Sequence, residues 1–300
     1  MVWHTELAVF RRAACSGALC IPDGGLRGVI MRKLLFISDL DGTLLNEDKQ
    51  VPQKNIDAIR RFTQAGGLFT IATGRSEETC RVAADRLPIN APAILYNGAL
   101  VYDLKESRVL AQRQLEAALF RPVIRDIMER FPDICIEVLV CGDLLLPNPQ
   151  AVMDPFILRE KQSYHFADLS RLPEHWLKFM LSAPPQRLQE AEEYLSGCEL
   201  PPCGRFYSSE YYYEFLPVDC TKGHAAQKLA DMLGVAREDT AVIGDHLNDI
   251  ELLQWAGAAF APSSAHPAAQ KNAKVLAHSN NEGAVADAIE EFMRQKAGSL

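Results

Sequence analysis

Two aspartates near the start of the chain could do chemistry together. Asp39 and Asp41 follow the apolar run Leu34–Ile37 and stand two residues apart, with Gly42 and Thr43 directly after them. Residues i and i+2 of a strand point to the same face, so the two carboxylates are expected to lie close together. At about 5 Å they would repel each other by roughly 3 kcal/mol at an effective dielectric constant near 20, and a cation between them would reverse that sign. The spacing predicts a catalytic carboxylate pair, with a plain turn rich in Asp and Gly as the alternative.

An EF-hand calcium loop is a second way to explain closely spaced aspartates. Such a loop needs glycine at its sixth position and glutamate at its twelfth. Counted from Asp39, those positions hold Leu44 and Gln50. The sequence therefore excludes a calcium site of that kind.

Further polar residues follow other predicted strands or begin a predicted helix: Thr73, Lys222, Asp245, Asn248 and Asp249. Ligands of open α/β sheets bind beyond the carboxyl ends of the strands, so these residues are expected to share one crevice. Lys222 would hold an anion together with the free N–H groups of its helix. Carboxylate oxygens suit Mg²⁺. Carboxylates, a lysine and a hydroxyl around a metal form a site suited to phosphoryl transfer.

The elements that must position these residues alternate between strand and helix. Apolar runs at 68–72 and 93–96 predict strands, and the periodicity of 52–65 and the residues after Ser76 predicts helices. The same alternation returns with a helix at 222–233, strands at 240–243, 258–261 and 274–276, and a helix at 282–295. Continuous apolar strands that alternate with helices predict a parallel sheet covered on both faces, that is, a Rossmann-like α/β core.

The segment between these two parts has a different pattern. Strands are predicted at 134–140 and 144–146 around a Cys-Gly-Asp turn, at 178–182, and as a pair at 205–208 and 211–216, with a helix at 186–195. We therefore expect a core formed by 31–102 and 218–300, with residues 103–217 inserted as an α+β cap domain. Residues 1–30 lack helix or strand periodicity and are expected to be a loose tail or to precede the true start at Met31.

The ordered set of motifs resembles that of the haloacid dehalogenase-like (HAD) phosphatases. Asp39-Leu40-Asp41-Gly42-Thr43, Thr73-Gly74-Arg75, Lys222-Gly223 and Gly244-Asp245-x-x-Asn248-Asp249 look like the four motifs of these enzymes. The long insertion, with Asn97-Gly98-Ala99, is similar to the Cof-type subfamily, which carries an α/β cap of type IIB. The resemblance covers about residues 31–295.

The resemblance also implies roles for individual residues. Asp39 would be the nucleophile, and Asp41 the general acid and then the base, with Lys222 and Thr73 as further catalytic residues that hold the phosphoryl oxygens. The implied Mg²⁺ site comprises Asp39, Asp41 through its carbonyl, Asp245 and, in support, Asp249. The implied substrate-binding residues are Thr73, Gly74, Arg75, Asn97, Lys222 and Asn248. The segment 261–267 departs from the loop usual in this family, which leaves the substrate range open.

Composition narrows the function classes. The chain has 300 residues, of which 48% are hydrophobic, and a formal net charge of −8, which argues against a nucleic-acid-binding surface. No uninterrupted apolar stretch is long enough to span a bilayer. Eight scattered cysteines without a Cys-x-x-Cys pair are typical of idle thiols in a reducing cytoplasm.

The sequence thus predicts a cytoplasmic Mg²⁺-dependent phosphatase that acts on a small phosphorylated metabolite, such as a sugar phosphate, a nucleotide or a phosphorylated cofactor. Two alternatives remain: a sugar phosphomutase or phosphotransferase with the same motifs, and a non-catalytic regulatory binding protein. The pattern indicates nothing about the oligomeric state.

Overall fold

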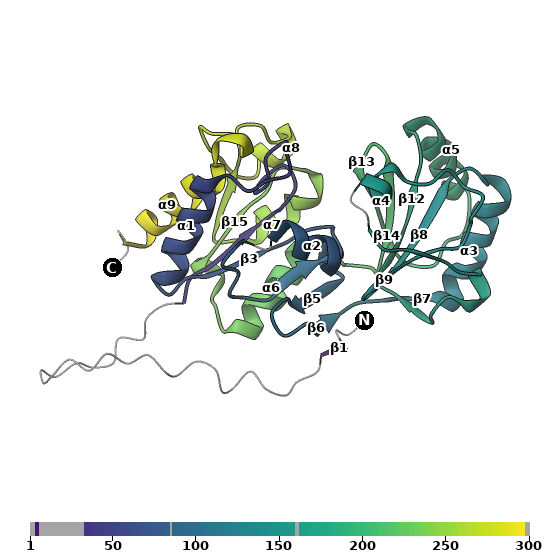
Figure 1. Cartoon of the computed structure of the whole chain (residues 1–300), viewed down its shortest axis with the longest axis horizontal. Helices are drawn as coiled ribbons and strands as arrows, with labels where there is room; N and C mark the ends of the chain where they lie inside the picture. The colour runs from purple at the N-terminus through teal and green to yellow at the C-terminus, as the bar shows by residue number, and fades with distance from the viewer. Residues whose placement is uncertain (1–3, 6–32, 85, 160–161, 298–300) are drawn as a thin grey trace, which may run out of the picture.

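The structure is a computed structural model that describes residues 4–5, 33–84, 86–159 and 162–297. Its two parts, each built around a sheet of its own, lie side by side (Figure 1). The expected N-terminal tail lies outside the described residues, apart from β1 (His4–Thr5), which pairs antiparallel with Gln112 and Ala111. Within the described ranges, no helix is long and apolar enough to cross a membrane.

A five-stranded parallel sheet forms the centre of the core. Its order is β17-β16-β15-β2-β3, with β2 (Leu35–Ser38), β3 (Leu68–Ile71), β15 (Thr240–Ile243), β16 (Ala258–Ala261) and β17 (Lys274–Val275). β2 pairs with β3 on one side and with β15 on the other. The chain order reverses at this strand, so the carboxyl end of β2 is the position where open sheets of this kind bind ligands.

Alternating side chains of β2 bury against different layers of helices. Phe36 packs with Phe62 of α1 (Gln53–Gln64) and Phe292 of α9 (Ala284–Ala297). Leu35 and Ile37 belong to another apolar cluster, with residues of α6 (Lys222–Leu233) and α7 (Ile250–Trp255). Both faces of the sheet are therefore covered, as the continuous apolar strands predicted.

The third predicted strand has a different partner from the one expected. Residues 93–96 form β4 (Ala93–Leu95), which pairs antiparallel with β5 (Leu100–Asp103). β5 pairs in turn with β6 (Arg108–Gln112). A single parallel bridge, Ala72 to Ile94, links β4 to the end of β3. The tight turn Tyr96–Gly98 explains this pairing, because it reverses the chain directly after β4 and brings β5 back antiparallel to it.

The inserted part is built on a six-stranded sheet. Its order is β10-β9-β8-β12-β14-β13, with β8 (Cys135–Val140), β9 (Asp143–Leu146), β12 (Lys178–Ser182), β13 (Gly204–Ser209) and β14 (Tyr212–Leu216). Both predicted hairpins are present. α5 (Pro185–Ser196) and α3 (Ala117–Arg130) cover one face. The fold class is thus the predicted one, a parallel α/β core with an inserted α+β cap.

The remaining helices and strands are short: α2 (Glu77–Ala84), α4 (Pro155–Arg159), α8 (Pro267–Gln270), β7 (Leu115–Glu116), β10 (His165–Phe166) and β11 (His175–Trp176).

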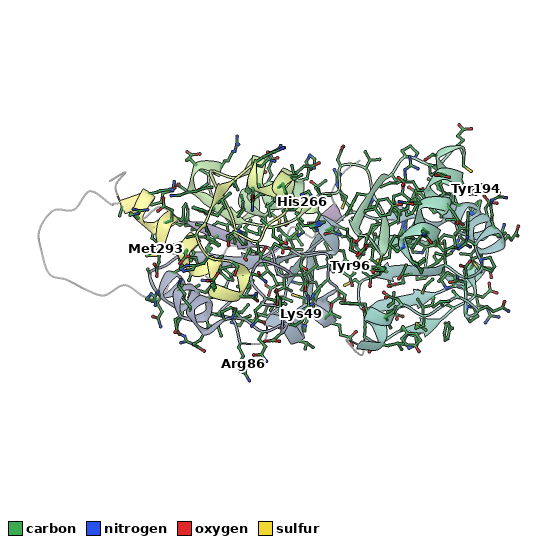
Figure 2. All side chains as sticks on the ribbon, turned by 90° about the horizontal axis from the view of Figure 1, so that it is seen from above. Lys49, Arg86, Tyr96, Tyr194, His266 and Met293 are labelled. Atoms are coloured by element: carbon green, nitrogen blue, oxygen red, sulfur yellow. The ribbon has the colours of Figure 1, made fainter. Side chains whose placement is uncertain are left out.

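The core and the cap meet where the chain crosses between them and at Tyr96. Arg113 donates through Nη1 to the carbonyl of Val218 at 2.7 Å, so the outgoing and returning segments lie against each other. Since β6 pairs with β5 and not with the cap sheet, we propose Arg113, in place of residue 103, as the first crossing point. Tyr96 lies at the junction (Figure 2), where its hydroxyl contacts Glu77 of the core and the carbonyl of Val140 of the cap.

Candidate active site

The predicted site residues gather beyond the carboxyl ends of three neighbouring strands. Asp39 follows β2 directly, Thr73 follows β3 after one residue, and Asp245 follows β15 after Gly244. Lys222 arrives from the other side as the first residue of α6. The hydroxyl of Thr221 accepts from the backbone N–H of His224 and so caps this helix.

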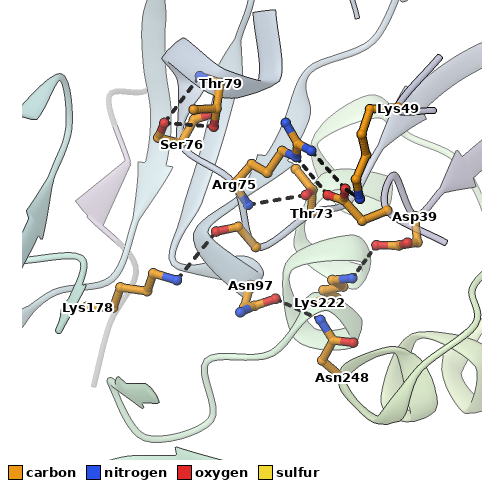
Figure 3. A network of polar contacts seen from close by, with 12 residues as sticks. Asp39, Lys49, Thr73, Arg75, Ser76, Thr79, Asn97, Lys178, Lys222 and Asn248 are labelled. Atoms are coloured by element: carbon orange, nitrogen blue, oxygen red, sulfur yellow. Dashed lines mark hydrogen bonds and ion pairs between the residues drawn. The ribbon is translucent and has the colours of Figure 1, made fainter. Parts of the chain in front are cut away.

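Lys222 bridges two carboxylates at the centre of this group. Its Nζ donates to Asp39 Oδ1 at 2.6 Å (Figure 3). The same Nζ donates to Asp249 Oδ1 at 2.7 Å. Lys222, Asp39 and Asp249 are all buried. Burial opposes the charge on Lys222, but Asp249 and Asp39 outweigh it and raise its pKa. Burial raises the pKa of Asp39 well above its usual range; Lys222 opposes this rise, and the charges of Asp249 and Asp245 add to it.

The same carboxylates form a group that could hold a metal ion. Oxygens of Asp39, Asp245 and Asp249 lie within 4.8 Å of one another. Burial and the charge of Asp249 raise the pKa of Asp245, as expected where carboxylates crowd without a cation between them. An all-oxygen donor set with excess negative charge fits a hard divalent cation such as Mg²⁺.

Gly42 and Thr43 position Asp245 from the first motif. Thr43 Oγ1 donates to Asp245 Oδ1 at 2.6 Å. Gly42 has a φ of +80°, and a Cβ there would lie 2.4 Å from Asp245 Oδ2. Glycine is therefore required at this position both for the backbone conformation and for the close approach of the carboxylate.

Asp249 has little capacity left for a metal. Its Oδ1 accepts from Lys222, and its Oδ2 accepts from the backbone N–H groups of Asp245 and His246 at 3.0 and 3.1 Å. Its contacts hold the loop after β15 and the ammonium group of Lys222 in place. This arrangement suits a residue that orients the ligands more than one that is itself a ligand.

Asp41 is held apart from this cluster by two cations. Arg75 donates through Nε to Asp41 Oδ2 at 2.7 Å and through Nη2 to Oδ1 at 2.8 Å, and Lys49 Nζ donates to Oδ1 at 2.9 Å. Burial would raise the pKa of Asp41, but Arg75 and Lys49 outweigh it and lower the pKa to about 2. In this arrangement Asp41 is an ionised acceptor.

The remaining predicted residues form the next layer around the site (Figure 3). The hydroxyl of Thr73 accepts from the backbone N–H of Arg75 at 3.2 Å. Asn248 donates through Nδ2 to Asn97 Oδ1 at 3.0 Å, and a Cβ at Gly74 would lie 3.0 Å from the Asn97 amide. The structure therefore brings together all the site residues that the sequence singled out.

The turn that carries Asn97 also packs against the start of α6. Gly98 has a φ of +103°, and a Cβ at this residue would lie 2.2 Å from the carbonyl oxygen of Thr221. Only glycine lets the backbone come so close. The turn after β4 thus braces the helix end from which Lys222 projects.

A cavity of about 480 Å³ opens over these residues and extends to the cap. Its lining includes cap residues that the sequence analysis missed: Glu137, Leu139, Phe156, Lys178, Met180, Tyr212 and Glu214. Lys178 donates to Glu214 at 2.8 Å and to the carbonyl of Gly74 at 3.4 Å, and Asn97 donates to Glu214 at 3.0 Å. A charge inside an apolar strand is the signal that could have drawn attention to Glu137, Lys178 and Glu214. The apolar and aromatic cap residues carry no such signal, and neither does Lys49.

The comparisons with known proteins agree with this geometry. The family model of haloacid dehalogenase-like hydrolases matches residues 36–289. This chain belongs to that family. The 5-amino-6-(5-phospho-D-ribitylamino)uracil phosphatase YwtE of Bacillus subtilis is 26% identical over 282 residues, with 85% of this chain and 96% of that protein covered.

Two further relatives extend the comparison. An HMP-PP phosphatase of Cronobacter sakazakii is 28% identical, over 76% of this chain and 84% of that protein. The crystal structure of a haloacid dehalogenase-like hydrolase from Bacteroides thetaiotaomicron superposes with a TM-score of 0.76 at 24% identity, over 87% of this chain and 99% of that one. The chain is therefore an enzyme of the phosphoric monoester hydrolase class, on the fold and with the Cof-type likeness that its motifs indicated.

Proposed function

We propose that this enzyme hydrolyses small phosphomonoesters, with Mg²⁺ as cofactor, through an aspartyl phosphate formed on Asp39. The buried cluster in which Lys222 lies 2.6 Å from Asp39, beside Asp245 and Asp249, carries this proposal. Carboxylates packed together away from water reduce the stability of a fold. Their retention at the end of the central strand is explained by the chemistry they make possible.

Asp39 is the group placed to attack phosphorus. As its oxygen forms a bond to phosphorus, the ester P–O bond breaks and its electron pair goes to the leaving oxygen. Lys222 holds the attacking carboxylate in one orientation and places a positive charge beside the phosphoryl oxygens. Thr73, buried at the end of β3, is a second group available to those oxygens.

Asp41 is proposed to transfer protons in both steps, first to the leaving group and then from the water. The leaving oxygen takes a proton from Asp41; a water later attacks the aspartyl phosphate, gives a proton to Asp41 and releases inorganic phosphate. Asp41 can carry that proton only after Arg75 and Lys49 have turned away from it. A phosphate dianion that enters the cavity competes with Asp41 for Arg75 and Lys49. We therefore propose that substrate binding draws both cations away from Asp41.

The metal would be held by carboxylate oxygens of Asp39 and Asp245 together with the carbonyl of Asp41, with Asp249 in support. When bound, it would supply positive charge that offsets the repulsion between the phosphate and these carboxylates. The crowded oxygens of Asp39 and Asp245 support this assignment.

The substrate is proposed to be a small phosphorylated metabolite. A cavity of about 480 Å³ suits a phosphate joined to a leaving group of moderate size. The two named relatives act on a phosphorylated ribitylaminouracil and on HMP-PP. Cap residues also line this cavity, and we assign to them the choice among such esters.

The test is phosphate release from p-nitrophenyl phosphate with and without Mg²⁺. We expect activity that disappears with a chelator and returns with Mg²⁺. Asp39→Asn should abolish it, and mass spectrometry of acid-quenched wild-type enzyme should detect a phosphate adduct on Asp39. Asp231→Asn, the same change at an exposed position on α6, is the matched control. Full activity of Asp39→Asn would rule out the mechanism.

A further inference from the structure

The face of the cap sheet that looks into the cavity carries two acidic residues in line with each other. Glu137 of β8 stands opposite Met180 of β12, which stands opposite Glu214 of β14. The alternate residues of these strands, such as Val138, Phe179 and Phe215, pack instead with α3 and α5. The sheet therefore buries its apolar face under its own helices and turns acidic groups toward the site.

Most of the charge on this face is already paired. Glu214 accepts from Lys178 at 2.8 Å and from the Asn97 amide at 3.0 Å. Lys178 and Glu214 thus neutralise each other. Their pair also ties the cap to the turn of the core that carries Asn97.

Glu137 is the exception. It is 1% exposed and lines the cavity, and its Oε1 receives no hydrogen bond from any residue that the structure describes. Asp154, 2% exposed, likewise has an Oδ2 without a donor among the described residues. Its Oδ1 accepts from the hydroxyl of Tyr212 at 3.0 Å and from the N–H of Phe156 at 2.8 Å.

Glu137 and Asp154 act on each other directly. Burial raises the pKa of Glu137 well above its usual range, and the charge of Asp154 raises it further; Lys178 opposes this rise, and Glu214 adds to it. Glu137 Oε1 and Asp154 Oδ2 both remain without a donor among the described residues. The two acidic groups thus leave acceptor oxygens open beside the cavity.

A purely structural role does not explain this pair. Leu139 and Met180 lie on the same face and line the same cavity, so apolar side chains fit there. An apolar residue in place of Glu137 would avoid the cost of burying two carboxyl groups. Acidic groups retained at such a position point to a ligand that makes hydrogen bonds with them.

We propose that Glu137, oriented by Asp154, contacts the leaving group of the substrate and selects esters that offer hydroxyl or amino hydrogen-bond donors over those that carry a carboxylate or a second phosphate at that end. This inference rests on the proposed function, because it assumes that the phosphate lies against Asp39 and Lys222. The cap side of the cavity is then the place where a donor of the leaving group meets an acceptor. An anionic group there would meet the negative charge of the pair at close range.

The experiment compares two esters that differ at the end remote from phosphate. Glucose 6-phosphate offers hydroxyl groups, and 6-phosphogluconate carries a carboxylate. Each is measured as a competitor of p-nitrophenyl phosphate hydrolysis with Mg²⁺, so turnover of either is not needed. We expect wild-type enzyme to bind glucose 6-phosphate at least about tenfold more tightly.

Glu137→Gln tests the residue itself. It keeps the size of the side chain and removes the charge, so the preference should shrink by about tenfold. The preference is a ratio of two inhibition constants measured on the same variant, so a general change in the turnover of p-nitrophenyl phosphate does not alter it. Glu199→Gln, at an exposed position on the cap, should leave the preference unchanged.

The outcomes separate this inference from the proposed function. An unchanged preference in Glu137→Gln, no preference in wild-type enzyme, or no inhibition by either ester overturns the inference while hydrolysis of p-nitrophenyl phosphate stands. Absence of hydrolysis refutes the proposed function instead. In that case the affinities of wild type and Glu137→Gln for the two esters are measured by calorimetry. The ratio between the two affinities in each protein then tests the inference.

Discussion

Replacement of the proposed nucleophile should make the metal-free enzyme more stable while it abolishes activity. In the folded state Asp39, Asp245 and Asp249 share one cation, Lys222, so the cluster carries a net charge of −2 when all three carboxylates are ionised. Asp39→Asn changes that net charge to −1. Lys222 keeps its contact with Asp249 and is not left unpaired.

The magnitude follows from the distances. Carboxylate oxygens up to 4.8 Å apart repel by roughly 3.5 kcal/mol per pair at an effective dielectric constant near 20, and Asp39 has two such neighbours. On the same scale, Lys222 at 2.6 Å attracts Asp39 by roughly 6 kcal/mol. Repulsion and attraction nearly cancel, so the cost of burying a charged Asp39 decides the sign. We expect a gain in stability on the order of 1–3 kcal/mol.

The shift in the pKa of Asp39 also indicates that its charged form is unfavourable in the folded, metal-free protein. Burial raises this pKa, and so do the charges of Asp249 and Asp245, with Lys222 opposing. A carboxyl group whose folded pKa is raised contributes stability at low pH that is lost as the pH rises through that pKa. The advantage of Asp39→Asn should therefore be larger at pH 8 than at pH 5.

The assay is thermal unfolding in a chelator and then with Mg²⁺. In chelator, Asp39→Asn should unfold at a higher temperature than wild type, by about 2–4 °C for each kcal/mol. Mg²⁺ should raise the wild-type midpoint more than that of the variant, because the variant has lost a ligand. Asp231→Asn serves as the control and should move neither value. A lower midpoint for Asp39→Asn in chelator would refute the electrostatic reasoning.

Three further predictions concern single residues. Gly42→Ala places a Cβ 2.4 Å from Asp245 Oδ2 and should lower both Mg²⁺ affinity, measured by calorimetry, and activity; retention of both would contradict the close approach. Thr221→Ala removes the cap of α6 and should cost about 1 kcal/mol in urea unfolding, against no change for Thr221→Ser. Because burial and the charge of Asp154 raise the pKa of Glu137, wild type should lose stability relative to Glu137→Gln as the pH rises; parallel pH profiles would count against the raised pKa.

The site was predictable because its residues stand at the ends of strong elements. The strands that precede Asp39 and Asp245 are short, mostly apolar and buried. The helix that begins at Lys222 ends before Gly234, as its pattern indicated. Residues fixed by such elements are placed by the topology of the sheet. Their convergence could therefore be inferred across gaps of more than a hundred residues.

The local sequence pattern did not predict elements in which one residue argues against the structure that forms. α3 was missed because Pro122 lies inside it, and proline is a strong argument against a helix interior. Burial of Phe120, Ile124 and Ile127 against the cap sheet outweighs the hydrogen bond that the proline cannot make. The partner of β4 was missed because strand direction depends on the turn that follows, where Asn97 has a positive φ.

The cap residues were missed for a different reason, and it bears on how specificity is built. Glu137 is a single charge in the otherwise apolar strand Cys135–Val140, and from sequence alone it marks only an interruption. A charge at that position is costly in a sheet that is covered by helices, unless the other face meets a cavity. The core motifs and the cap charges thus follow one rule, in which buried charge is retained only where a ligand meets it. In the core several charged residues stand close together in the sequence motifs. In the cap, Glu137 and Glu214 are single acidic residues of β8 and β14, and only the register of both strands against Met180 of β12 brings them into line.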